Sequence, residues 1–160
     1  MKMLFVADLH YTLKQFDWLL AHATDYDPII IGGDLLDLGS VLDADTQIMV
    51  VEKYLYRLRQ RTRVVVCSGN HDLDSCNPAG EAVAGWLHDV KAANLFLDGT
   101  NVELSGAFLT ICPWWDADLS RPSRSRVRVT IRADQKTLDL GLSCAAGRFS
   151  GLLERQEICG

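Results

Sequence analysis

The chain has 160 residues, of which 48% are hydrophobic and 23% charged, and its formal net charge is −5 at pH 7. This length fits one domain with a substantial core, and the composition is ordinary for a soluble globular protein. The negative charge gives no reason to expect nucleic acid or an anionic membrane as a partner. The apolar start at residues 3–7 is too short for a signal peptide or a membrane span, so we expect a cytoplasmic protein.

The early part of the chain alternates between strand and helix patterns. Short apolar runs predict strands over about 2–7, 29–31 and 64–67. Between them, hydrophobic residues at three- and four-residue steps predict one helix from about Leu13 and another over 43–61. This order is typical of right-handed parallel crossovers, and the all-apolar strands indicate a sheet covered on both faces.

The pattern continues less clearly toward the C-terminus. We expect a helix over about 81–93 and then three short strands, over 95–97, 102–104 and 107–111. The pair Trp114-Trp115 fits either a pocket wall or ordinary core or interface packing. Residues 127–132 alternate as a strand does, and from residue 133 to 160 both helix and strand signals are thin.

Charge also changes along the chain. Residues 1–116 carry 8 basic and 16 acidic residues, a net of −8, whereas residues 117–160 carry 8 and 5, a net of +3. We therefore expect an α/β domain over 1–116 and an atypical, poorly ordered basic tail over 117–160. The five cysteines form no CxxC pair or zinc pattern, and we expect them to be reduced and mostly buried.

Each of the first three strands runs directly into residues that can bind metals. They are Asp8 and His10, then Asp34, then Asn70, His71 and Asp72. The ends of parallel strands meet at one sheet edge, where ligands of open α/β folds gather. Carboxylate, imidazole and amide ligands suit Mn, Fe or Zn. Asp34 is central enough to bridge two ions, and His71 is suited to act as an acid or charge stabiliser.

Each motif alone also has a purely structural explanation. An aspartate such as Asp8 often caps the helix after a strand, and Gly33-Asp34 is a turn signal. The histidine in Asn70-His71-Asp72 is not required by turn chemistry. All three motifs in succession, each behind a hydrophobic strand, favour a metal or phosphate site.

Asp8-x-His10, Gly33-Asp34 and Gly69-Asn70-His71-Asp72 resemble the first three motifs of the calcineurin-like metallophosphoesterase family, over about the first 116 residues. The resemblance implies a β-sandwich flanked by helices (αββα) and hydrolysis of a phosphate mono- or diester by a metal-bound hydroxide. It implies that Asp8 and His10 hold one metal, that Asp34 bridges and that Asn70 holds the second. It also implies that His71 stabilises the transition state or protonates the leaving oxygen, and that Asp72 orients His71.

The family completes its site with later histidines, including a Gly-His-x-His motif, which this sequence lacks. Its four histidines are His10, His22, His71 and His88, and the sequence context of His22 and His88 favours exposed or packed side chains. We therefore expect an incomplete sandwich, a weakly bound second metal, and an exposed apolar sheet face that promotes self-association. Two explanations are an altered reading frame after about residue 116, which the Arg/Ser-rich tail favours, and a lineage that has lost catalysis.

Two other functions are compatible with the sequence. A non-catalytic module could retain a partial metal site and act through a protein partner. The arginines between residues 121 and 132 could contact nucleic acid, although a solvated charge run explains them more simply. The substrate stays open among monoesters, diesters, nucleotides and nucleic acids.

Overall fold

The computed structural model describes residues 2–104, 107–114, 125–133 and 136–144. Its centre is a sheet of four parallel strands in the order β1-β2-β3-β6. These strands are β1 (Leu4–Val6), β2 (Ile29–Ile31), β3 (Val64–Val66) and β6 (Leu95–Phe96). The predicted alternation of strands and helices with parallel crossovers is confirmed, as is the α/β fold class.

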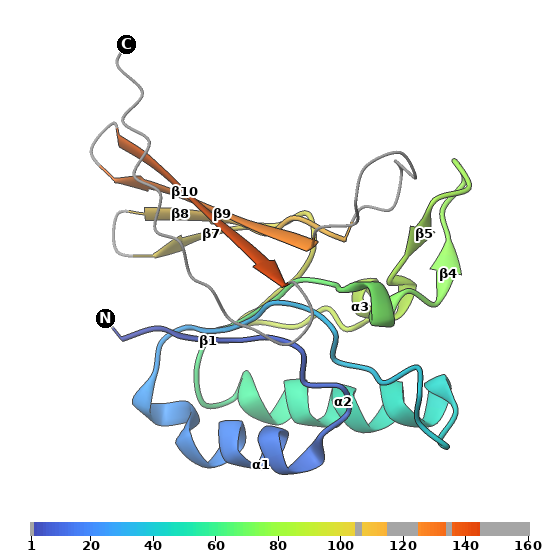
Figure 1. Ribbon diagram of the computed structural model, residues 1–160. Coiled ribbons are helices and arrows are strands. Elements are labelled where there is room, and N and C mark those ends of the chain that lie inside the picture. The colour runs from blue at the N-terminus through green and yellow to red at the C-terminus, as the bar shows by residue number, and fades with distance from the viewer. Residues whose placement is uncertain (1, 105–106, 115–124, 134–135, 145–160) are drawn as a thin grey trace.

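Two helices cover one face of this sheet (Figure 1). They are α1 (Leu13–His22), which continues into the 3₁₀ turn η1 (Ala23–Asp25), and α2 (Ala44–Leu58). Their buried residues recur at helical spacing and include Phe16 and Leu19 on α1 and Leu55 and Leu58 on α2. Asp43 caps α2 by accepting a hydrogen bond from the Thr46 N–H at 2.8 Å.

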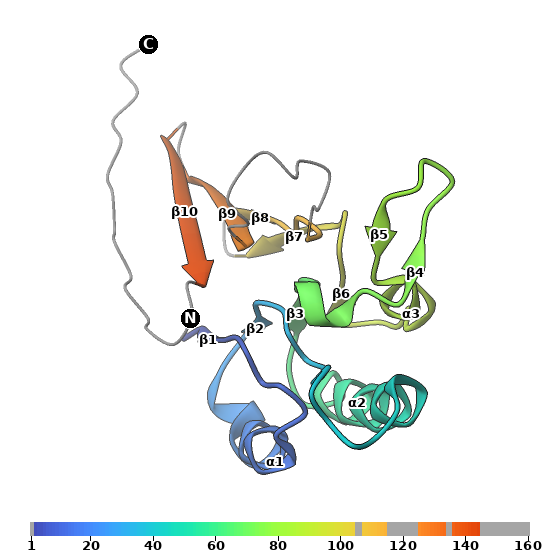
Figure 2. The ribbon, with the colours of Figure 1, turned by 45° about the vertical axis from the view of Figure 1, so that its right-hand side comes forward.

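A β-hairpin covers the other face of the sheet. It consists of β7 (Asn101–Leu104) and β8 (Ala107–Thr110), and Figure 2 shows it across the sheet from the helices. Because side chains alternate along a strand, Ile30 and Val65 face this hairpin and are buried, whereas their strand neighbours face the helices. The sheet is therefore less exposed than expected, and the layers are helix, sheet and sheet, consistent with part of an αββα sandwich.

The predicted helix over residues 81–93 is wrong in extent. The structure has β4 (Ser75–Cys76), β5 (Ala82–Val83) and a short helix, α3 (Gly85–Asp89). Other partners take both groups of the first hydrogen bond of the longer helix, in which the Gly85 N–H would donate to the Glu81 carbonyl. The Gly85 N–H donates to Asp74 Oδ1 instead, and the Glu81 carbonyl accepts the Asn77 N–H at 2.9 Å.

Two further strands form a separate antiparallel pair, β9 (Ser125–Ala133) and β10 (Lys136–Cys144), and β9 lies beside β8. The predicted strand over 127–132 is confirmed within β9. No strand was expected at β10, although Leu138, Leu140 and Leu142 alternate there with polar or small residues. The described residues do not include Trp115. They also leave out residues 117–124, 134–135 and 145–160 of the predicted tail. In the part of the chain described, no helix is long and apolar enough to cross a membrane.

Candidate metal centre

The carboxyl ends of β1, β2 and β3 bring the predicted ligands to one edge of the sheet. One ligand atom each from Asp8, His10 and Asp34 lie within 4.8 Å of one another. Asp8 and His10 belong to the loop after β1, and Asp34 to the loop after β2. A group of two carboxylates and one imidazole at this spacing can surround a single divalent ion.

The backbone of these loops adopts a conformation that side chains disfavour. The φ angles of Asp8, His10 and Asp34 are 56°, 41° and 54°, all in the left-handed region. For a residue with a Cβ this conformation costs about 1–2 kcal/mol. Such strain persists only where surrounding contacts impose it, and it gathers at functional sites. Three residues in this conformation within one ligand group are typical of a functional site.

Hydrogen bonds between the first two loops hold the strained backbone. The N–H groups of Asp8, His10 and Tyr11 donate to the carbonyl oxygens of Gly33, Asp34 and Leu35 at 3.1, 2.9 and 2.8 Å. These bonds extend the pairing of β1 with β2 beyond the regular strands. The ligand side chains thus project from a braced pair of loops rather than from free ends.

The third loop packs directly against Asp34. A Cβ at Gly69 would collide with the backbone nitrogen and the carboxylate of Asp34, so only glycine fits this position. The N–H of His71 donates to Asp34 Oδ1 at 3.0 Å. Asn70 and His71 begin the 3₁₀ turn η2 (Asn70–Asp72), where the side chain of Asn70 is exposed beside this contact.

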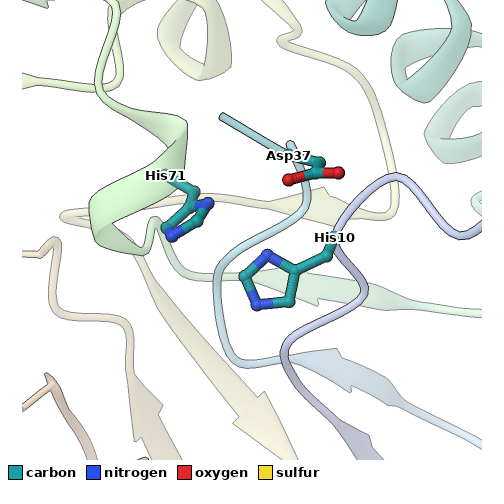
Figure 3. A group of neighbouring side chains, drawn as sticks. All are labelled: His10, Asp37 and His71. Atoms are coloured by element: carbon teal, nitrogen blue, oxygen red, sulfur yellow. The ribbon is translucent and has the colours of Figure 1, made fainter. Parts of the chain in front are cut away.

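A second group of ligand atoms contains a residue that the sequence interpretation missed. Atoms of His10, Asp37 and His71 also lie within 4.8 Å of one another, and Figure 3 shows the three side chains directed toward one another. The two imidazole rings are 4.6 Å apart at their centroids and meet edge to face. His71 Nδ1 accepts a long hydrogen bond, 3.4 Å, from the Leu38 N–H. The sequence signal that could have indicated Asp37 is a carboxylate that follows the apolar pair Leu35-Leu36 in the loop after β2.

Asp72 has a different environment from the one predicted. It is fully buried, and its carboxylate accepts backbone N–H groups from both loops, those of Leu35 and Leu36 at 2.9 and 3.0 Å and that of Gly69 at 2.8 Å. Burial raises the pKa of Asp72 to about 7, while these hydrogen bonds act in the opposite direction. Its hydrogen bonds join the second and third loops and do not involve the His71 ring.

A buried carboxylate at the fourth strand braces the third loop from behind. Asp98, two residues after β6, accepts the N–H of Ser68 at 3.0 Å, and Ser68 Oγ accepts the N–H of Trp114 at 2.9 Å. Burial raises the pKa of Asp98. Local sequence patterns do not reveal this supporting role, because it depends on a contact between residues 30 positions apart.

The other two histidines lie away from both groups, as predicted. His22 bonds through Nδ1 to the Trp18 carbonyl at 2.8 Å and stacks on the Trp18 ring, with centroids 4.3 Å apart. His88 is exposed on α3. Among the described residues, neither belongs to a group of metal-ligating atoms.

The model of the calcineurin-like phosphoesterase family matches residues 1–120, three quarters of the chain. The chain belongs to the calcineurin-like phosphoesterase family. No curated protein matches it in sequence. Calcineurin-like phosphoesterases are metal-dependent and act on phosphate esters. Among the described residues of this member, the candidate ligand groups are the two that share His10. The family resemblance noted in the sequence is confirmed.

Proposed function

We propose that this chain is a metal-dependent phosphoesterase that hydrolyses a phosphate mono- or diester at the carboxyl edge of its parallel sheet. The observation that carries the proposal is the convergence of Asp8, His10 and Asp34 on strained, braced backbone. Family membership supplies the reaction class. A backbone conformation of this cost, held by contacts between the loops, is typical of functional sites.

The donor set fits divalent metal ions. Carboxylate and imidazole ligands suit Mn, Fe or Zn, and two groups that share His10 are compatible with two ions. We assign Asp8, His10 and Asp34 to the first ion, with Asp34 bridging, and Asn70 to the second. Bound ions would supply Lewis-acid charge for water activation and for the phosphoryl oxygens. With so few ligands to share, the second ion binds more weakly.

His71 acts directly on the substrate in this proposal. It donates a proton or a hydrogen bond to the leaving oxygen or to a phosphoryl oxygen, and its place beside His10 puts it at the ligand group. Asp37 replaces Asp72 as the carboxylate beside the His71 ring and can hold that ring in position. Asp72 and Asp98 are positioning residues that fix the loops.

The division at residue 116 also remains a proposal. Residues 1–116 would form the phosphoesterase part and residues 117–160 a basic tail, and the family match ends close to this boundary, at residue 120. In the described residues β9 lies beside β8, so part of the tail would extend the hairpin layer.

Turnover by the purified full chain tests the function. The protein is assayed with Mn²⁺ on an aryl phosphodiester and on an aryl phosphomonoester. We expect Mn²⁺-dependent hydrolysis, reduced about 100-fold or more in Asp34→Asn and in His71→Ala. His88→Ala is the matched control, because His88 is exposed and outside the site, and it should retain full activity.

Two results contradict parts of the proposal. Hydrolysis that persists in Asp34→Asn and His71→Ala places the activity at another site. Tight binding of Mn²⁺ without hydrolysis of either ester favours the non-catalytic alternative, a module that keeps a metal site and acts through a partner.

A further inference from the structure

A hollow of about 310 Å³ lies at the edge of the sheet opposite the candidate metal centre. Its wall includes Asp27, Arg63 and Asn94, which stand just before β2, β3 and β6, so the hollow opens at the amino ends of these strands. The metal-ligating groups are at the carboxyl ends. The two sites are therefore separated by the length of the sheet and cannot share a ligand.

Positive charge in the hollow exceeds negative charge. Three arginines line it, Arg59, Arg61 and Arg63, with one carboxylate, Asp27. Arg63 and Asp27 form a two-point ion pair with distances of 2.8 and 2.9 Å, and this pair holds the pKa of Asp27 below its usual range. Among the described residues no carboxylate forms an ion pair with the other two arginines. Two guanidinium charges thus face the hollow without a counter-charge.

The contacts of Arg59 and Arg61 do not neutralise them. Each donates through Nη1 to a backbone carbonyl, Arg59 to Ala93 at 3.2 Å and Arg61 to Leu20. Nε of Arg59 is buried and has no hydrogen-bond partner in the described part of the chain. A buried charged donor in this state is costly, and an anion held in the hollow beside this guanidinium would offset part of that cost through its charge.

The end of α2 explains some of this charge but not its arrangement. Cations at a helix C-terminus interact favourably with the helix dipole. The last carbonyl of α2, that of Leu58, accepts the N–H groups of Arg61 and Thr62, at 2.8 and 3.1 Å. The side chains of Arg59 and Arg61 donate to carbonyls outside α2, so these contacts do not cap the helix. Residues 1–116 carry a net charge of −8, which makes a local surplus of arginine at one hollow unusual for this domain.

Neutral donors complete the wall. Thr24 and Gln60 line the hollow and carry hydroxyl and amide groups, whereas the Thr62 hydroxyl already donates to the Tyr26 carbonyl at 2.6 Å. Tyr26 is the one aromatic residue among the residues that line the hollow. The ammonium group of Lys2 lies 4.5 Å from the Tyr26 ring centroid and adds a further positive charge near this wall. Guanidinium forks combined with hydroxyl and amide donors match the oxygens of a phosphate group better than those of a neutral ligand.

We propose that this hollow binds a small phosphate-bearing anion at a site distinct from the metal centre. Its volume is at the lower end of small-molecule sites, which suits a phosphate group with a small organic part or inorganic phosphate alone. Inorganic phosphate and a phosphorylated metabolite would use the same recognition chemistry. The proposal depends on Arg59 and Arg61 and does not depend on the phosphoesterase activity.

NMR titration of the full-length, ¹⁵N-labelled chain, kept metal-free with a chelator, tests this proposal. Inorganic phosphate and AMP are the two probes. We expect saturable shifts of the backbone amides of Thr62, Arg63 and Asn94 and of the Arg59 Nε–H, with Gly69 and His71 unaffected. Tighter binding of AMP identifies a phosphorylated metabolite as the ligand type, and equal or tighter binding of phosphate identifies the inorganic ion.

Shifts confined to Gly69 and His71, or shifts that never saturate with either probe, overturn the proposal. Variants supply an independent check. Arg59→Gln combined with Arg61→Gln should weaken binding about tenfold or more, whereas Arg57→Gln, at the same helix end but outside the hollow, should leave it unchanged. Asp27→Asn should tighten binding, because it releases Arg63 from its ion pair. Equal affinity in all of these variants would also overturn the proposal, and the wild-type titration stands even if a variant does not fold.

Discussion

Asp72 shows how one buried side chain can hold together two loops of a candidate site. Its carboxylate is fully buried and accepts three backbone N–H groups from two loops. The sequence predicted that Asp72 orients its neighbour His71. Sequence proximity suggested that role, whereas the fold turns the carboxylate toward residues 35 and 36, which no local pattern could indicate.

Asp72→Asn should therefore destabilise the protein. One carboxylate oxygen becomes an NH₂ group, which leaves a buried N–H without an acceptor and costs about 1–3 kcal/mol. Urea denaturation measures the loss. Asp74→Asn is a control, because Asp74 is exposed and its Oδ1 can still accept the Gly85 N–H. Equal stability of the two variants would contradict the loop-joining role.

Asp98 should make stability depend on pH. Burial raises its pKa above the ordinary value of 3.8, so in the folded state it keeps a proton that the unfolded chain has already released. The free energy of unfolding should therefore decrease as pH rises above about 4. In Asp98→Asn this part of the dependence should disappear, while the amide oxygen still accepts the Ser68 N–H. The free energy of unfolding is measured across this pH range for both proteins. An equal slope of this free energy against pH in the two proteins would exclude the effect.

At the scale of elements, the sequence predicted the strands and helices that follow from a local hydrophobic pattern. Three apolar runs and two amphipathic helices were sufficient to place the ligands at one sheet edge. The helix expected over residues 81–93 failed because Asp74 and the Asn77 N–H take the two groups of its first hydrogen bond, which the hydrophobic pattern does not reveal. Asp37 was missed because it approaches His10 and His71 only through the path of the loop after β2.

Close packing of two of these loops gives a direct prediction. In Gly69→Ala the new Cβ collides with Asp34, so the loops must separate and affinity for Mn²⁺ should fall at least about tenfold. Gly80→Ala is the control. Gly80 has a φ of +83° but open space around it, so an alanine there introduces backbone strain without a collision. Calorimetric titration with Mn²⁺ that gives the same affinity for both variants would show that this contact does not shape the site.

At the scale of the whole molecule, the sheet is covered by helices on one face and by a hairpin on the other. The sequence predicted the first layer well, and it predicted the hairpin as separate strands. It gave little sign of β10, since a leucine alternating with small and polar residues is a weak strand signal in isolation. Pairing with β9 decides the conformation of that segment.

The proposed boundary near residue 116 predicts where the chain is cut first by trypsin. If residues 117–160 are a poorly ordered basic tail, cleavage should occur first at Arg124, because trypsin does not cut the Arg121-Pro122 bond, and a fragment that contains the phosphoesterase part should persist. Mass spectrometry of a time course identifies the sites. First cleavage at Arg57 in α2, or at Arg59 or Arg61 just after it, would place the weakest part of the molecule elsewhere and contradict the boundary.

Metal binding at the carboxyl edge is the central claim, and calorimetric titration of the metal-free full chain with Mn²⁺ tests it most directly. The wild type should bind Mn²⁺, and Asp34→Asn should bind it at least about tenfold more weakly, because a central carboxylate is lost. Asp89→Asn removes an exposed carboxylate at the end of α3 and should bind like the wild type. Equal affinity in the wild type and Asp34→Asn would contradict the assignment of this edge as the metal centre.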